Sequence, residues 1–312
     1  MTETYVGVDV SKGWIDVYDP QRGSFRVDME RAALQAFARS LKNRPVTVVL
    51  EATGGYERGL LVALEAAGIA WHRANPARAR HFARAIGVIG KTDRVDAQCL
   101  WRMGEQLQLE PTPPLSHELK ALKTLSVRRR QLVEMRKREK TRIQQFDDKT
   151  IRQSITGVIR YLTRQIDRIE AQIAALANSP RLASKVGLLT SVPGIGPVVS
   201  ATLVAELPEL GTTDRRSIAS LAGLAPIARE SGTMRAKRRI GKGRPIVRAA
   251  LYIAALHASR WDPGFRAFRR RLEAKGKTTN QAICAVARKL LTILNAMVKT
   301  GQTYEPREAA LI

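Results

Sequence analysis

Four acidic residues in the N-terminal third could together perform metal chemistry. Asp9 lies in the stretch TYVGVDV, Glu51 ends the apolar run VTVVLE, and Asp93 and Asp96 belong to GKTDRVDA. Carboxylates that converge repel one another and stay ionised together only around a cation. Ligation by oxygen alone favours Mg²⁺, with Mn²⁺ as the second choice. Two such ions can activate an attacking oxygen and stabilise a leaving oxygen at phosphorus, so these four residues are the candidate metal ligands and catalytic residues.

Each of these carboxylates also has a purely structural interpretation. Asp9 could cap the end of a strand, and Asp93 could serve the positive N-terminal end of a helix. Spacing alone does not select the set, because four other acids of this region are spaced in a similar way: Asp16, Asp19, Glu57 and Glu65.

The elements that would position these acids can be read from the apolar pattern. Residues 4–10 alternate as a strand, with the valines on one face and Tyr5, Gly7 and Asp9 on the other. Gly7 leaves room beside Asp9. Residues 46–51 form a continuous apolar run that is typical of a buried strand. Asp93 and Asp96 are three residues apart on a predicted helix, so that their Cβ atoms would be about 5–6 Å apart, and Thr92 could cap that helix.

The remaining segments of this region complete an α/β domain with a mixed sheet. WIDVYD and SFRVDM are predicted to follow the first strand as antiparallel neighbours, and IAWHR is a further strand. Four segments have helical spacing: RAALQAFARSLK, YERGLLVALEAAG, PARARHFARAIG and TDRVDAQCLWRMGEQL. The proline-rich stretch LEPTPPL is the predicted boundary, which gives a first domain of residues 1–112.

Residues 113–180 are predicted to form a helical arm, because they hold almost no Gly or Pro. Their second half carries a heptad seam: Ile155, Ile159, Leu162, Ile166, Ile169, Ile173 and Leu176. A weaker seam runs through Leu122, Leu125, Leu132 and Met135. A coiled-coil arm that self-associates and an ordinary helical pair packed on its own domain both fit, with the turn near DDKTIRQ or at Gly157.

Residues 181–300 are predicted to form a helical domain with loops, followed by a tail of residues 301–312. SVPGIGPVVSATLVAEL resembles a helix-hairpin-helix element, in which Gly194 and Gly196 would let the backbone approach a phosphate. A plain helix–helix turn is the alternative. A short helix capped by a threonine is expected to end at Gly223, and a long one is expected from about Asn280 to Lys299, capped by Thr279. Between them lies a basic stretch that we interpret as a loop.

The charge predicts a polyanionic partner. The 312 residues carry 53 Lys and Arg against 28 Asp and Glu, a net charge of +25. Residues 1–112 are nearly neutral, with 15 basic and 13 acidic residues, whereas the rest holds 38 basic and 15 acidic residues. Nucleic acid is the default partner for such a surface, and a ribosome-like or merely very soluble basic protein is the alternative.

Several classes of protein are excluded or disfavoured. The two cysteines, Cys99 and Cys284, are far apart and lack metal-site spacing, which excludes a disulfide framework and disfavours a zinc site. The start has no signal-peptide layout, and we see no apolar run of the roughly 20 residues that a bilayer span needs. We therefore expect a protein of the cytosol, without a membrane.

Two basic segments are the candidate nucleic-acid contacts, and they would hold phosphates rather than read sequence. Segment 121–142 has many Lys and Arg and only two glutamates, and its candidates are Arg128, Arg129, Arg130, Arg136 and Lys137. The second segment contributes Arg229, Arg235, Lys237, Arg238, Arg239, Lys242 and Arg244. Aromatic residues make up only 5% of the chain, so base stacking is not expected to be the main contribution to nucleic-acid affinity.

Five motifs, in order along nearly the whole chain, resemble the DEDD transposases of the IS110 insertion-sequence family, a group that includes Piv-type site-specific invertases. They are YVGVDVSK, LEATGGYE, GKTDRVDA, VPGIGPVVSATLVAEL and SGTMRAKRRIGKGRPIVRAALY. The resemblance implies an RNase H-like (RuvC-like) first domain and a C-terminal transposase domain. It also implies that Asp9, Glu51, Asp93 and Asp96 are the DEDD metal ligands and that Ser231 is a nucleophile.

The same resemblance implies a reaction and its partners. Serine would attack a DNA phosphodiester and form a covalent phosphoserine. The active site would combine the first domain of one protomer with the transposase domain of another, in a tetramer built from dimers. A structured bridge RNA would read target and donor DNA.

Without the resemblance, Ser231 would be interpreted as a loop or capping serine. It is followed by Gly232 and has Arg229 and Arg235 nearby, but no histidine close in sequence could act as its base, and the nearest downstream is His257. A metal ion or clustered arginines could instead favour the alkoxide. Two other functions stay open: a metal-dependent nuclease of the Holliday-junction type, and a non-catalytic nucleic-acid-binding scaffold.

Overall fold

The structure is a computed structural model that describes residues 4–88, 93–231 and 234–306; for residues 93–95 and 228–238 it describes the backbone only. The chain divides into two compact units, Met1–Pro114 and Leu115–Ile312. Each unit has its own hydrophobic core.

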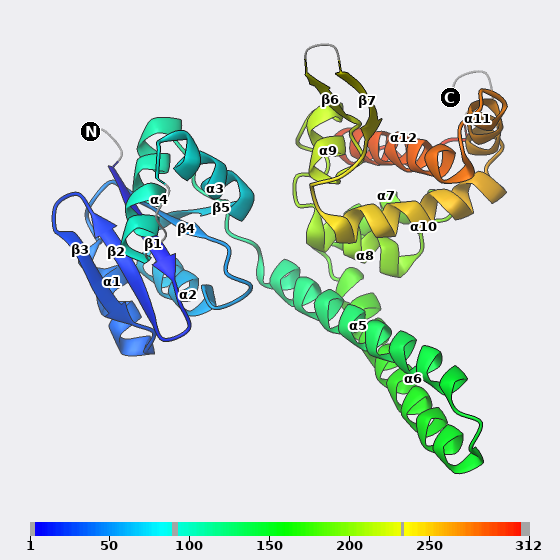
Figure 1. Cartoon of the computed structure of the whole chain (residues 1–312), viewed down its shortest axis with the longest axis horizontal. Coiled ribbons are helices and arrows are strands. Elements are labelled where there is room, and N and C mark those ends of the chain that lie inside the picture. The colour runs from blue at the N-terminus through cyan, green and yellow to red at the C-terminus, as the bar shows by residue number, and fades with distance from the viewer. Residues whose placement is uncertain (1–3, 89–92, 232–233, 307–312) are drawn as a thin grey trace. The chain divides into compact units, whose positions relative to one another are not determined.

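The first unit contains a mixed five-stranded sheet in the order β3-β2-β1-β4-β5 (Figure 1). The first three strands form an antiparallel meander, and β4 and β5 run parallel to β1. Their bounds are β1 Thr4–Val10, β2 Trp14–Asp19, β3 Gly23–Asp28, β4 Val46–Glu51 and β5 Ala70–Ala74. The mixed sheet expected from the sequence is therefore confirmed.

Helices cover both faces of this sheet. The valines of β1 pack with β4 residues such as Leu50 against α1 (Arg31–Ser40) and α2 (Arg58–Ala67). The opposite face, with Tyr5 and Val49, packs on Leu100 and Met103 of α4 (Asp93–Leu107), next to α3 (Pro76–Ala85). A strand that is buried on both faces reads as a continuous apolar run, which explains the sequence of β4.

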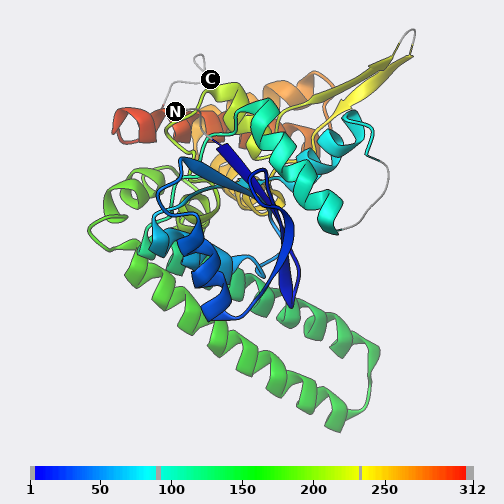
Figure 2. The same ribbon diagram turned by 90° about the vertical axis from the view of Figure 1, so that its left-hand side faces the viewer.

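The second unit begins with a long helical hairpin, which Figure 2 shows as two helices side by side. Its elements are α5 (His117–Arg142), a short 3₁₀ turn (Ile143–Gln145) and α6 (Lys149–Ala177), so the chain reverses at 143–148 and Gly157 lies within α6. Four residues of the predicted α6 seam are buried: Ile155, Leu162, Ile166 and Ile173. On α5, Leu122 and Leu132 are buried, but Met135 is 47% exposed, so the weaker seam does not extend to Met135.

The rest of this unit is a helical core to which a two-stranded ribbon is attached. The elements are α7 Ala183–Thr190, α8 Pro197–Glu206, α9 Arg215–Leu221, β6 Ile227–Ser231, β7 Met234–Arg239, α10 Pro245–Trp261, α11 Pro263–Ala274 and α12 Thr279–Thr300. By length and composition α12 could cross a membrane, with a mean hydropathy of 1.4 over its most apolar window. Half of that window is buried in the unit, where Leu290, Leu291 and Leu294 form part of the core.

Two expected helix caps were wrong by one residue. Asp214, not a threonine, caps α9 by accepting hydrogen bonds from the Arg216 and Ser217 amides. Thr278, not Thr279, caps α12 and forms a capping box with Gln281. Adjacent polar residues compete for such a position, and the register of the apolar face decides between them.

The basic stretch before α10 is not an irregular loop, as its sequence had suggested. β6 and β7 pair antiparallel from Ile227 opposite Arg239 to Ser231 opposite Met234. A two-stranded ribbon of this kind lacks the alternating apolar pattern that marks a half-buried strand, so its strands were not predicted.

Two glycines fix the base of the ribbon. Gly223 (φ 70°) follows α9, and Gly243 (φ 58°) precedes α10. A Cβ atom on Gly243 would lie 2.4 Å from the Gly223 nitrogen and 2.6 Å from the Leu221 oxygen. The Arg244 amide also donates to the Leu221 carbonyl at 2.8 Å. Both strands of the ribbon thus leave from one closely packed point.

Candidate active site and nucleic-acid contacts

The pairing of β1 with β4 places two of the candidate carboxylates side by side. The parallel register runs from Thr4 beside Val46 to Val8 beside Leu50. Asp9 and Glu51 are the next residues on the two strands, and neighbouring strands are about 4.8 Å apart. Both residues lie on the face that also carries Tyr5 and Val49, which is the face covered by α4.

Helix α4 lies directly on this face because β1 has no side chain at Gly7. A Cβ atom there would be 1.9 Å from the Ala97 carbonyl oxygen and 2.5 Å from the Trp101 nitrogen. The room beside Asp9 that Gly7 was expected to leave is therefore filled by the backbone of α4. This close contact brings Asp96, one residue before Ala97, to the strand that carries Asp9.

Asp9, Glu51 and Asp96 line one cavity of about 650 Å³. The other wall is formed by α3, from which the exposed residues Arg80 and Arg84 line the same cavity. The sequence interpretation missed these two arginines. Their signal was the spacing of four residues in PARARHFARA, which places both on one face of a helix.

The chemistry of this donor set fits a hard divalent cation, because three carboxylates from three elements line one open cavity and offer only oxygen atoms. As the described side chains lie, no three acidic, histidine or cysteine residues are close enough together to hold an ion. The three carboxylates therefore line the same cavity without meeting at one point. The fourth candidate, Asp93, begins α4, and its side chain lies outside the described residues.

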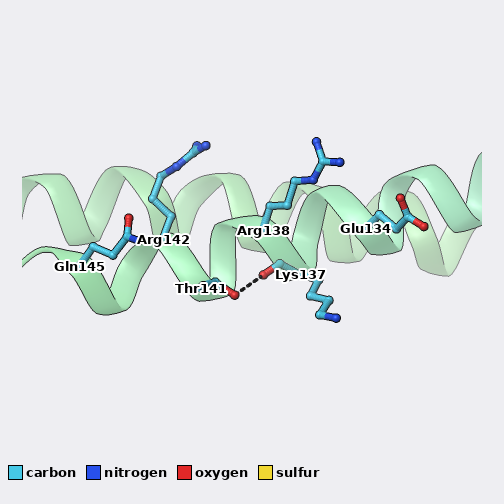
Figure 3. A pocket seen from close by; sticks show the side chains of 6 residues that line it. All are labelled: Glu134, Lys137, Arg138, Thr141, Arg142 and Gln145. Carbon is cyan, nitrogen blue, oxygen red and sulfur yellow. Dashed lines mark hydrogen bonds between the residues drawn. The ribbon is translucent and has the colours of Figure 1, made fainter.

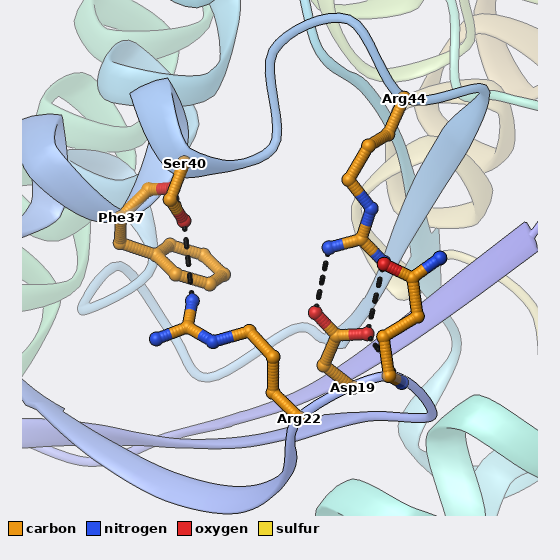
Figure 4. Close-up of polar contacts among 6 residues, drawn as sticks. Asp19, Arg22, Phe37, Ser40 and Arg44 are labelled. Atoms are coloured by element: carbon orange, nitrogen blue, oxygen red, sulfur yellow. Dashed lines mark hydrogen bonds and ion pairs between the residues drawn. The ribbon is translucent and has the colours of Figure 1, made fainter.

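Of the four other acids with similar spacing, three are paired with arginines: Asp16, Asp19 and Glu57. Arg26 contacts Asp16 at 3.0 Å, and Arg44 contacts Asp19 at 2.7 and 2.9 Å (Figure 4). Burial alone would raise the pKa of Asp19, but the hydrogen bonds from Arg44 and the Gln21 amide outweigh it and lower that pKa. These ion pairs give Asp16 and Asp19 a structural role.

Glu57, the third, organises the turn that follows Glu51. Its carboxylate is buried, forms an ion pair with Arg73 of β5, and accepts hydrogen bonds from the Thr53 hydroxyl (2.9 Å) and the Gly55 amide (2.8 Å). Burial raises its pKa, and the hydrogen bonds and the charge of Arg73 outweigh that effect and lower it. We infer that Glu57 holds the ATGG turn in place at the rim of the cavity that Thr53 also lines.

The candidate nucleophile lies in the other unit. Ser231 is the last residue of β6 and is paired with Met234; its side chain and residues 232–233 are outside the described part of the chain. Four of the basic candidates, Arg229, Arg235, Lys237 and Arg238, belong to the same ribbon and also have undescribed side chains. Arg239 and Lys242 are exposed near its base.

Arg244 is held by the protein itself. It forms a two-pronged ion pair with Glu209, at 2.5 and 2.6 Å. Burial raises the pKa of Glu209, but Arg244 and the backbone outweigh this and lower it. The pair ties the start of α10 to the segment after α8, next to the glycines at the base of the ribbon.

The candidate phosphate contacts of the arm are also of two kinds, exposed residues and residues held by partners within the protein. Arg128 and Lys137 are exposed, whereas Arg129 pairs with Glu170 of α6 at 2.6 Å and Arg136 donates to Thr163 at 3.3 Å. Arg130 is half-buried. Beyond Lys137, the last turns of α5 expose Arg138 and Arg142, which extend this basic surface (Figure 3).

The two glycines of the PGIGP turn have different surroundings. A Cβ atom on Gly194 (φ 92°) would be 2.8 Å from the Ala254 oxygen and 3.0 Å from the His257 Cβ, so this glycine allows the turn to pack on α10. Gly196 precedes α8 as its N-cap residue, with open space where a side chain would be. Gly196 is thus the one of the two with room for a ligand.

Comparison with known proteins agrees with this layout. Residues 6–150 match a sequence profile of the DEDD transposases of IS110 elements, and residues 186–270 match the profile of the transposase IS116/IS110/IS902 family. The first match spans the first unit and α5, the second lies within the second unit, and together they cover most of the chain. The DEDD profile implies an RNase H-like fold, with which the mixed five-stranded sheet agrees.

Individual relatives point the same way. The pilin gene-inverting proteins of Moraxella lacunata and Moraxella bovis are 29% identical over 336 aligned positions, which cover 98% of this chain and 99% of theirs. The 43.6 kDa protein of insertion element IS110 from Streptomyces coelicolor is 32% identical over 50% of this chain and 38% of its own length. With two domain profiles in order and a full-length relative, this chain belongs to the IS110 family of DEDD transposases.

Proposed function

We propose that the protein is an insertion-sequence transposase and recombinase that cuts and joins DNA through Ser231, with Mg²⁺ held by Asp9, Glu51, Asp93 and Asp96. The observation that supports this most is the single cavity lined by three of these carboxylates together with two arginines. An acidic cavity beside guanidinium groups suits a phosphodiester, because the cations attract the phosphate that the carboxylates alone would repel.

The part that each residue plays in the reaction follows from its chemistry. The Ser231 hydroxyl gives up its proton, and its oxygen attacks phosphorus and forms a P–O bond. The bond from phosphorus to one deoxyribose oxygen breaks, and that oxygen takes up a proton and leaves as a hydroxyl. A strand hydroxyl then gives up its proton and attacks the phosphoserine, and the serine oxygen leaves and takes up a proton. Arg80 and Arg84 orient the phosphate, and Glu57 holds the turn that follows Glu51. Mg²⁺, when bound, would lower the pKa of an attacking hydroxyl and neutralise developing charge.

The cavity and Ser231 belong to different units of the chain. We propose that a complete site forms between two protomers, the first unit of one and the second unit of another. We further propose that dimers assemble through the arm and pair into a tetramer. Beside its buried seam, α6 carries three apolar side chains with exposures of 41 to 54%, which could contact a second arm: Ile151, Val158 and Tyr161.

We also propose that a bridge RNA, encoded beside the gene, selects target and donor DNA, and that the reaction takes place in the prokaryotic cytosol or nucleoid. The basic residues that are exposed, such as Arg128, Lys137, Arg239 and Lys242, would hold phosphates of either nucleic acid without reading sequence. Specificity would then rest on base pairing with the RNA.

A second candidate is a metal-dependent nuclease that uses water. It is favoured by one observation: the acidic cavity lies entirely within the first unit. A nuclease needs no serine, so Ser231 decides between the two. If the protein were only a nucleic-acid-binding scaffold, loss of the carboxylates would change nothing.

The test combines the purified protein, the RNA transcribed beside its gene, labelled target and donor DNA, and Mg²⁺. We expect a covalent protein–DNA adduct that mass spectrometry places on Ser231, and that is lost in Ser231→Ala and in Asp9→Asn. Ser154→Ala and Asp28→Asn, exposed on α6 and β3, are the matched controls. Cutting without an adduct in Ser231→Ala would establish the nuclease. Wild-type activity in Asp9→Asn would refute the metal site, and full activity without RNA would refute guidance.

A further inference from the structure

Trp261 ends α10 with 71% of its surface exposed, more than any other large apolar residue described in the structure. Exposing a large aromatic side chain to water is unfavourable in free energy. A surface tryptophan is therefore a frequent anchor for a binding partner. Ile253, two turns earlier, is 50% exposed, and the exposed His257 lies between them. Because these residues are four apart, they form one stripe along α10.

The corner that presents Trp261 is rigid. The next residue, Asp262, is only 1% exposed, caps α11 through the Phe265 amide at 2.9 Å, and accepts a hydrogen bond from the Tyr304 hydroxyl at 2.7 Å. The rings of Tyr304 and Phe265 stack with centroids 6.3 Å apart. The indole is therefore attached to a fixed backbone, and little order would be lost on binding.

The sequence around Trp261 is cationic. Arg260 and Arg266 flank it in sequence, both exposed, and the Arg266 guanidinium donates to the Arg260 carbonyl. Residues 245–274 contain two acids, Asp262 and Glu273. The first is buried and the second is paired with Arg269 at 3.0 Å, so neither offsets the charge of the exposed arginines. A flat aromatic ring among arginines is complementary to a base flanked by phosphates.

The same stripe adjoins the PGIGP turn. Gly194 packs against Ala254 and the His257 Cβ, and His257 lies one helical turn from Trp261. The turn leads into the N-terminus of α8 at Gly196, which no side chain caps within the described part of the chain. The backbone at the start of α8 therefore follows a turn that packs on the same helix that carries Trp261.

We propose that Trp261 stacks on an unpaired base of single-stranded DNA, with Arg260 and Arg266 on the flanking phosphates. The inference deepens the proposed function, on which it rests, because strand exchange at a cut site exposes unpaired bases. The site reads a π face rather than an edge, so it tolerates any base.

The test measures DNA binding in EDTA, where no reaction occurs. Fluorescence anisotropy compares a labelled single-stranded oligonucleotide, the duplex of the same sequence, and the matching RNA strand. We expect Trp261→Ala to weaken binding of single-stranded DNA about tenfold, since stacking on one aromatic ring is worth about that much, and to leave duplex affinity unchanged. Trp261→Phe should retain most of the affinity. Val62→Ala, another exposed apolar residue (64%), is the control.

A second readout separates stacking from charge. Trp261→Ala should leave the slope of log affinity against log salt unchanged, whereas Arg266→Ala should reduce it by about one. Unchanged single-strand affinity in Trp261→Ala, or an equal loss on duplex, would overturn the inference and leave the proposed function standing. A loss confined to RNA would overturn the choice of DNA. A wild-type chain that binds no nucleic acid would refute the proposed function itself.

Discussion

Replacing Gly7 with alanine tests the contact that organises the acidic cavity. The added methyl group would lie 1.9 Å from the Ala97 carbonyl oxygen, whereas ordinary contacts begin at 3.4 Å. Both the obstacle and its neighbour at Trp101 are backbone atoms of α4, which cannot rotate away as a side chain would. Helix α4 must therefore retreat from β1 by roughly 1.5 Å, and Asp96 would retreat with it.

The expected magnitude follows from that displacement. Overpacking of a core typically costs about 1–3 kcal/mol, and we place Gly7→Ala at about 3 kcal/mol because backbone must move. For a domain of this size, that would lower the melting temperature by roughly 10 °C or more. A displacement of about 1 Å in a catalytic group can reduce the rate about 100-fold, so cleavage should fall by that factor in the fraction that stays folded.

The assay combines thermal unfolding with single-turnover DNA cleavage in Mg²⁺ and with a DNA-binding titration. DNA affinity should be nearly unchanged, because its candidate determinants, Arg80 and Arg84 of α3 included, do not lie on α4. Gly13→Ala is the control, since nothing lies within 4 Å of the position of its Cβ atom. At Gly104 the atoms in the way are side chains of Tyr5 and Val49, so alanine there should cost stability but less activity. Wild-type stability and cleavage in Gly7→Ala would show that α4 does not lie on β1 as described.

Three further changes test the ion pairs and the core. The lowered pKa of Glu57 means that its stabilisation is complete above its ordinary value of 4.5 and is lost as the pH falls through the folded-state value. Glu57→Gln should therefore be less stable at pH 7 and show a flatter acid-unfolding profile by circular dichroism; an unchanged profile would contradict this. Glu209→Gln should destabilise the second unit by about 1 kcal/mol in urea unfolding, because Arg244 loses its charged partner in a pair that is partly exposed to solvent. Asn295→Ala should cost about 2–3 kcal/mol in the same assay, since it frees the Gly211 amide and the Thr213 carbonyl that Asn295 bonds at 2.9 Å; a loss below 0.5 kcal/mol would count against that role.

The sheet could be predicted because its pattern follows from burial. The continuous run at 46–51 and the alternation at 4–10 reflect a strand covered on both faces and its neighbour. That the two strands pair in a register that sets Glu51 beside Asp9 is known only from the structure. The spacing of the other acids in this region could not rule them out as metal ligands. Only the fold shows that Asp16 and Asp19 meet Arg26 and Arg44, which are 10 and 25 residues away.

Cations were the least predictable part of the site. A surface arginine gives no sign of what it faces, so Arg80 and Arg84 were missed, although they line the cavity. For the same reason, Arg129 and Arg244 were assigned to phosphate, whereas Glu170 and Glu209 hold them in the structure. Such pairs join residues 41 and 35 positions apart, and neither periodicity nor local motif encodes that distance.

Gly223 and Gly243 are closely packed at the base of β6 and β7, so the ribbon can pivot at that point. Strand β6 (Ile227–Ser231) spans about 15 Å, so a rotation of about 10° at its base would carry the far end by roughly 2–3 Å. That is comparable with the whole approach distance between an attacking oxygen and phosphorus. If Ser231 is the nucleophile, small shifts in how α9 meets α10 can therefore engage or withdraw it, with no rearrangement of the carboxylates.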